Sequence, residues 1–228
     1  MIAHKKKFFS GFGLLLSFGV VLAILFSPVF NGQNGLNYFD DLYNSISKDS
    51  AYYIPALKKD AEGYASTPVV AKIKMADENQ ASQAALLFGK AGAEATVSGN
   101  QISVNGNLGK VFESCLEDTD SMYHNDGKTV SSKYGMEEKQ VIYNWYMAFK
   151  ALSKDLNAQK KFKDAKMIDT ISKKAVELSY NYYTIEPRKI SDSVGIVTFS
   201  LVFYVIYTMW FGFAVLFMFE GWGLKLEH

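Results

Sequence analysis

Two long apolar runs, separated by a polar stretch, dominate the pattern of the chain. Residues 8–30 and 193–219 contain no Asp, Glu, Lys, Arg or His. The first of these runs is apolar over ~19 residues, which as a helix reach roughly 28 Å, about the thickness of a hydrocarbon core. The second run is longer and can cross a bilayer with some tilt. We therefore predict transmembrane helices over residues 8–30 and 193–219.

The flanks of these runs predict how the chain is inserted. The first run is longer than the apolar segment of a secretory signal peptide, and no small-residue cleavage site follows it, so we expect an uncleaved anchor. Lys5, Lys6 and Lys7 lie directly before it, and such residues favour the cytoplasmic side. We expect residues 1–7 and 220–228 to be cytoplasmic, in a two-pass inner-membrane protein of a bacterium whose periplasmic or otherwise extracytoplasmic domain spans 31–192.

The polar centre begins with a mixed pattern of strands and helices. Residues 36–47 have a helical apolar face, and residues 69–75 alternate as a half-buried strand does. Residues 78–90 read as a helix. Two short alternating runs then follow, joined by Gly99 and Asn100, which favours a hairpin. Asn107 can cap the next helix, whose buried stripe we expect to be Val111, Phe112, Cys115, Leu116, Thr119 and Met122.

The rest of the centre is helical in pattern. Residues 136–156 and 160–182 carry apolar residues at helical spacing, and the short joint between them predicts an antiparallel helical hairpin. The predicted fold is therefore an α+β membrane protein. Two transmembrane helices flank a mostly helical extracytoplasmic domain that contains a small strand, helix, hairpin and helix unit.

Composition then excludes several classes of function. The net charge is +1, and a duplex-binding protein needs a concentrated basic surface, so we expect no nucleic acid partner. The single cysteine excludes a disulfide framework and a CxxC pair. Neither apolar run contains histidine, the usual axial ligand of a b-type haem. The sequence also lacks the P-loop, GxSxG, HExxH and dinucleotide motifs, so we expect neither catalysis nor a cofactor.

One polar cluster contains residue types that bind metals. His124, Asp120 and Asp126 lie close together in the sequence, and imidazole and carboxylate groups are common metal ligands. The spacing fits neither an EF-hand nor a His-x-x-x-His pair. We therefore expect no metal, and interpret the cluster as a solvated helix end that runs into a turn at residues 125–127.

The apolar runs also suggest how transmembrane helices pack. Ser10, Gly13 and Ser17 share one face of the first helix, and Thr208 and Gly212 share one face of the second, where backbones can approach closely. Tyr207 and Trp210 lie near the middle of the second helix, where their polar atoms need partners. The two helices can pack on each other, on a partner subunit, or on both.

These observations favour a non-catalytic accessory subunit of a multisubunit membrane complex. Its expected partners are other integral membrane subunits, an extracytoplasmic protein and lipid. A respiratory or electron-transfer complex is the preferred host, because small two-span accessory subunits are common there. Two alternatives remain open. One is an oligomeric two-span channel, and the other is an extracytoplasmic sensor that signals through a partner.

Overall fold

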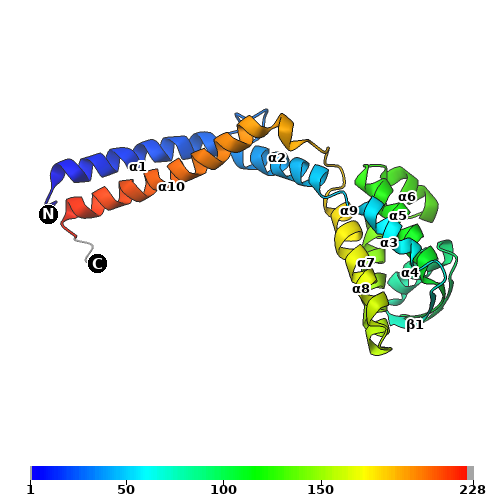
Figure 1. The fold of residues 1–228 in the computed structure, drawn as a ribbon. Coiled ribbons are helices and arrows are strands. Elements are labelled where there is room, and N and C mark those ends of the chain that lie inside the picture. Colours follow the sequence, from blue (N-terminus) through cyan, green and yellow to red (C-terminus); the bar gives the residue numbers. More distant parts are fainter. Residues whose placement is uncertain (1, 225–228) are drawn as a thin grey trace. The chain divides into compact units, whose positions relative to one another are not determined.

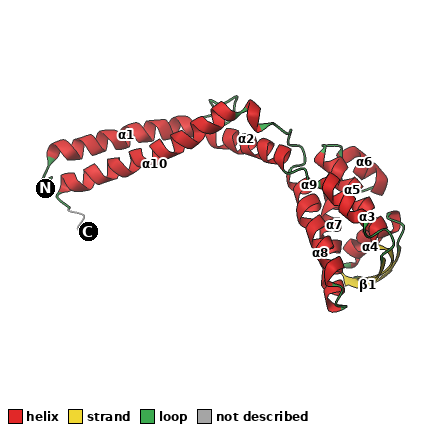
Figure 2. Ribbon diagram, viewed as in Figure 1, coloured by secondary structure: helices red, strands yellow, loops and turns green. Residues whose placement is uncertain are grey.

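The computed structural model describes residues 2–224 and divides into two compact units. The first, here called the helix-pair unit, joins residues 1–46 to residues 187–228. The second, here called the central unit, spans residues 47–186. Figure 2 shows that the chain is mostly helical, with its strands confined to one small sheet.

The helix-pair unit is built on two long helices, α1 (Lys5–Phe26) and α10 (Val194–Trp222), which lie side by side (Figure 1). Both are long and apolar enough to span a membrane. Helix α1 includes the three lysines and ends short of residue 30, because Pro28 disfavours helical backbone at Ser27. Helix α10 continues past residue 219 and ends at Gly223, whose φ of 86° is left-handed.

Two glycines allow α1 and α10 to approach closely. A Cβ on Gly11 would lie 2.7 Å from the carbonyl oxygen of Ala214, and one on Gly221 would lie 2.5 Å from the backbone nitrogen of Phe8. Beside the second contact, Lys7 Nζ pairs with Glu220 at 2.8 Å. The absence of side chains at these two positions therefore sets the distance between the helices.

Helix α2 (Gly35–Ser50) contains the predicted helix 36–47. Asn34 starts it by accepting a hydrogen bond from the backbone N–H of Asn37, at 2.9 Å. Most of α2 belongs to the helix-pair unit, and its last residues, from Ser47, are counted with the central unit. A short 3₁₀ turn, η2 (Ile190–Asp192), precedes α10.

The central unit contains a three-stranded antiparallel sheet in the order β1-β3-β2. The predicted alternation over residues 69–75 is confirmed in β1 (Pro68–Lys74), where Val69, Ala71 and Ile73 are buried. The predicted hairpin is also confirmed: it joins β2 (Glu94–Ser98) to β3 (Gln101–Asn107), with φ of 58° at Gly99. Helix α4 (Glu78–Lys90) has the predicted bounds and packs on the sheet, as does α7 (Glu138–Ala158).

Helix α5 (Leu108–Tyr123) is central to the packing of this unit. Asn107 caps it by accepting a hydrogen bond from the backbone N–H of Lys110, at 3.1 Å, as predicted. All six residues of the predicted stripe are buried. Helix α3 (Ile54–Glu62), which carries Pro55 in its first turn, packs against α5.

The remaining helices differ in part from the sequence prediction. Helix α7 (Glu138–Ala158) packs against α8 (Phe162–Ile171), its predicted hairpin partner. The second arm is not one regular helix, because a π-helical turn, η1 (Ser172–Val176), separates α8 from α9 (Glu177–Asn181). The turn predicted at 125–127 leads into a further helix that the sequence did not predict, α6 (Gly127–Tyr134).

Candidate functional site

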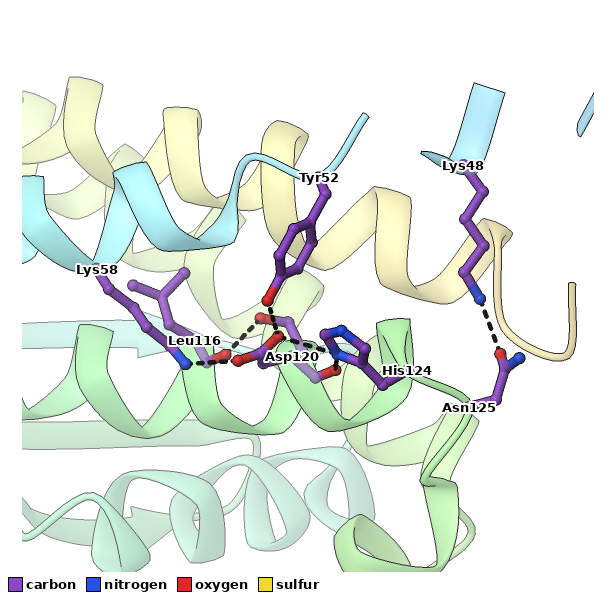
Figure 3. A network of polar contacts seen from close by, with 8 residues as sticks. Lys48, Tyr52, Lys58, Leu116, Asp120, His124 and Asn125 are labelled. Atoms are coloured by element: carbon purple, nitrogen blue, oxygen red, sulfur yellow. Dashed lines mark hydrogen bonds and ion pairs between the residues drawn. The ribbon is translucent and has the colours of Figure 1, made fainter. Parts of the chain in front are cut away.

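Two of the three residues weighed as metal ligands in the sequence, Asp120 and His124, lie together in a cluster of polar side chains. Asp120 on α5 accepts hydrogen bonds from Lys58 Nζ at 2.6 Å and from the Tyr52 hydroxyl at 2.7 Å. His124 lies one turn further along α5, with its Nδ1 3.2 Å from an Asp120 carboxylate oxygen. Figure 3 shows these side chains converging on the one carboxylate. Asp120 therefore joins α5 to α3 and to the segment before it.

Within this cluster Asp120 and Lys58 form an ion pair. Burial alone would raise the pKa of Asp120, but the hydrogen bonds from Lys58 and Tyr52 and the nearby charges outweigh burial and lower it. Burial and the bond to Asp120 raise the pKa of Tyr52 to about 12. Asp120 is thus held as a carboxylate, with Lys58 as its counter-ion.

Asp126 does not join Asp120 and His124. Its carboxylate caps α6 by accepting hydrogen bonds from the Thr129 backbone N–H at 3.3 Å and the Thr129 hydroxyl at 2.6 Å. Across residues 2–224, no group of three or more His, Cys, Asp or Glu side chains is arranged to hold a metal ion.

A buried lysine that sequence reasoning missed lies beside this cluster. Lys48 is 1% exposed, and its Nζ donates to Asn125 Oδ1 at 2.9 Å and to the carbonyl oxygens of Tyr182 and Ile185 at 3.0 and 2.6 Å. Asn125 adopts a left-handed φ of 62° and also accepts a hydrogen bond from the Thr184 N–H, at 2.9 Å. Burial lowers the pKa of Lys48, and the charge of Glu186 opposes that shift. Lys48 thus ties together the two stretches through which the chain enters and leaves the central unit.

A second buried charge lies within the core. Asp118, 3% exposed, accepts hydrogen bonds from Trp145 Nε1 at 2.8 Å, the Tyr134 hydroxyl at 2.5 Å and Lys133 Nζ at 2.7 Å. The adjacent Cys115 thiol is fully buried, and burial raises its pKa, so it lies among the apolar core residues as a protonated thiol. The sequence placed Cys115 on the buried face but did not reveal that Asp118 shares it.

The central unit carries a groove lined by tyrosines, which we call the tyrosine groove. Its volume is about 240 Å³, and its walls come from α7, η1 and α9. Tyr143 and Tyr180 are 43% and 39% exposed. The lining residues are Ile142, Tyr143, Tyr146, Val176, Glu177, Tyr180 and Asn181.

The π-helical turn helps to form this groove. A π-helical turn inserts an extra residue into a helix, which changes the direction of the side chains that follow. Val176 is the last residue of η1, and Glu177 and Tyr180 lie in α9, which begins directly after it, so the turn presents them beside the α7 tyrosines. Lys139 Nζ lies 5.5 Å from the Tyr180 ring centroid. The sequence did not predict the turn that gathers these rings.

The predicted transmembrane packing residues fall into two groups. Trp210 Nε1 donates a hydrogen bond to the Leu14 carbonyl at 3.1 Å, and the Tyr207 ring stacks on Phe18 with centroids 4.4 Å apart, so both contact α1. Ser17 donates within its own helix, to the same Leu14 oxygen, at 2.9 Å.

The other four predicted positions lie away from the contact between α1 and α10. Ser10, Gly13, Thr208 and Gly212 are exposed, and a Cβ on either glycine would meet nothing within 4 Å. Gly11 and Gly221 take the role expected of the predicted glycines. Packing of the four exposed positions on a partner subunit stays a prediction.

Relatives provide no guide to these sites. Comparisons of the chain with protein family models, with curated proteins and with solved structures find no match.

Proposed function

We propose that this chain is a non-catalytic accessory subunit of a multisubunit membrane complex. Helices α1 and α10 anchor it as a two-pass protein with both termini in the cytoplasm, and the central unit lies outside the cytoplasm and docks a partner there. The observation that carries this proposal is the tyrosine groove.

The groove fits a docking role because of its lining. Tyrosines supply large rigid surfaces with a polar tip, and they are enriched where proteins bind one another. A groove of about 240 Å³ with rings exposed at its rim suits one or two side chains of a partner. The partner's apolar anchors would displace water from the rings, and the tyrosine hydroxyls would bond to its backbone.

The charged clusters support a non-catalytic role. Asp118 and Lys48 are saturated with hydrogen bonds inside the fold, and Asp120 is paired with Lys58. Throughout the described part of the chain, no buried side-chain nitrogen or oxygen lacks a hydrogen-bond partner. Each cluster thus has a structural use, because its groups already bond to one another rather than to a reacting molecule.

The membrane helices support the presence of partner subunits. Thr208 and Gly212, one turn apart on α10, present a small exposed surface that α1 does not cover. Small residues at this spacing let another helix approach closely. We propose that a transmembrane helix of a partner subunit packs there.

Purification of the intact chain from native membranes tests both contacts. The chain is extracted in mild detergent, and co-purifying proteins are quantified by mass spectrometry. Replacing Tyr143 and Tyr180 with alanine should remove the extracytoplasmic partner, whereas alanine at Phe162, which is 62% exposed outside the groove, should leave it bound. A monodisperse monomer with no associated subunit would contradict the proposal.

The transmembrane contact is tested separately with two glycines of α10. Gly212→Leu should reduce the amount of membrane partner recovered, because the added side chain fills the small surface. Gly195→Leu is the matched control, since Gly195 also lies in open space but in the first turn of the helix. Equal recovery with both variants would show that no partner packs at Gly212.

A further inference from the structure

A second hollow, here called the membrane groove, lies in the helix-pair unit where three helices meet. Its volume is about 420 Å³, within the range of small-molecule sites, and almost all of its lining is apolar. Leu25 comes from the end of α1, Leu36 and Phe39 from α2, and Leu201 from α10. Leu36 and Leu201 are 56% and 59% exposed, so the groove is open along its side.

Local sequence explains why the groove forms. Phe30 and Gln33 exchange backbone hydrogen bonds of 3.0 Å, which turns the chain sharply after α1. Gly35 then lets α2 start against α1, since a Cβ there would lie 3.1 Å from Leu25 Cδ2. Leu36, Phe39 and Tyr43 follow at helical spacing and form one wall.

One end of the groove is polar. Tyr43 on α2 and Ser200 on α10 join their hydroxyls at 2.6 Å. Ser200 is the seventh residue of the 29-residue α10. Leu25, next to the last residue of α1, and Tyr207 of α10 line the same groove, so the groove lies at the end of α1 that we propose to be extracytoplasmic.

Positive charge lies beyond the polar end. Arg188, the chain's one arginine, and Lys189 precede α10 and are exposed. The backbone N–H of Arg188 donates to the Ser45 carbonyl at 3.1 Å, which holds this pair beside the helix that carries Tyr43. Asp192 lies nearby and its carboxylate accepts a hydrogen bond from Ser191 at 3.0 Å, so Arg188, Lys189 and Asp192 together carry a net charge of +1. Arginine and lysine both bind phosphate, arginine through two parallel hydrogen bonds.

We propose that the membrane groove binds one phospholipid. An acyl chain lies between α2 and α10, the ester region lies at the Tyr43–Ser200 pair, and the phosphate is bound by Arg188 and Lys189. The inference rests on the membrane-spanning role proposed above. Charge complementarity with a phosphate beyond the polar end favours a phospholipid over a partner helix.

Native mass spectrometry of the full chain tests the site. Delipidated protein in detergent is titrated with phosphatidylglycerol, phosphatidylethanolamine or diacylglycerol, which lacks phosphate. Leu201→Trp, which fills the groove, should lower retention of both phospholipids at least fivefold. Val202→Trp, at the adjacent exposed position outside the groove, should retain them like the unmodified chain. Equal retention by the two variants would overturn the proposal.

The phosphate contact has its own test. Arg188→Gln combined with Lys189→Gln should weaken the binding of both phospholipids about thirtyfold, from the usual effect of each of two basic residues near a lipid surface, and leave the binding of diacylglycerol unchanged. An unchanged preference for phospholipid over diacylglycerol would refute this assignment.

A photocrosslinking amino acid at Leu201 identifies the occupant in native membranes. Crosslinked phospholipid supports the proposal, and a crosslinked polypeptide overturns it. Carbonate extraction of the same membranes shows separately whether the chain is inserted at all. A chain released by carbonate contradicts the membrane-spanning proposal, whereas an inserted chain that retains no lipid contradicts only the lipid site.

Discussion

Replacement of Asp118 by alanine tests whether the core of the central unit depends on one buried carboxylate. The change leaves the Trp145 indole N–H and the Tyr134 hydroxyl without their acceptor, and these residues are 0% and 6% exposed. Each unsatisfied buried donor costs about 1–3 kcal/mol. Lys133 loses its counter-ion too, but its side chain is 28% exposed and can be hydrated.

We expect Asp118→Ala to lower the free energy of unfolding by about 3–5 kcal/mol, the usual cost of removing one partner from a buried ion pair. In a unit of this size such a loss lowers Tm by on the order of 10–15 °C. The assay is urea unfolding of the intact chain in mild detergent, followed by near-ultraviolet circular dichroism. Exposed Asp169 is the control, and Asp169→Ala should change stability by less than about 0.5 kcal/mol.

Tyr134→Phe gives a second, graded measurement. It removes one donor to Asp118 and keeps the ring, so the expected loss is about 1.5–3 kcal/mol, the value of a hydrogen bond to a charged group. The double variant should lose less than the two single losses combined, because both changes break the same contact. A loss of less than 1 kcal/mol in Asp118→Ala, or strict additivity, would refute the reasoning.

Three further predictions concern the other contacts. Gly221→Leu should lower the melting temperature of the helix pair, followed by far-ultraviolet circular dichroism in detergent, because its side chain would strike the backbone of α1; Gly212→Leu should not. Lys48→Met should speed hydrogen exchange of the backbone amides over residues 183–186, because it removes the hydrogen bonds that hold the Tyr182 and Ile185 carbonyl oxygens. Because the folded pKa of Lys48 lies below 10.5, the unfolded chain binds that proton more tightly, so stability should rise with pH between the two values; this rise should vanish in Lys48→Met. Asp120→Asn should lower the free energy of unfolding by about 1 kcal/mol at neutral pH. Because the folded pKa of Asp120 is lowered, this difference in stability between the variant and the unmodified chain should disappear as pH falls through that folded pKa.

Local signals explain which parts of the central unit could be predicted from sequence. The alternation in β1, the hairpin at Gly99 and the cap at Asn107 each depend on residues a few positions apart, and the structure confirms all three. Helix α6 was not predicted, because it is short, mostly polar and follows a turn directly. The π-helical turn η1 gave no signal, since its residues also fit a regular helix.

The buried charges could not be predicted for a different reason. Lys48 bonds to carbonyl oxygens at Tyr182 and Ile185, more than a hundred positions along the chain. Its neighbours in sequence are polar, as they are around a surface lysine. Asp118 lies on α5 beside exposed acidic residues, and only the packing of α6 and α7 surrounds it with donors. The tertiary fold decides which charges are buried.

The phospholipid and the partner helix that we propose for α10 contact different stretches of that helix, so their tests are independent. The membrane groove is lined on α10 by residues 200–207, whereas the exposed small surface begins at Thr208 and continues to Gly212. Gly212 lies eleven residues beyond Leu201, which is ~16 Å along a helix. Gly212→Leu should therefore remove a partner helix without altering lipid retention, and Leu201→Trp should remove lipid without altering partner recovery. If either variant abolished both, the lipid would itself be part of the subunit contact, and the two sites would be one interface.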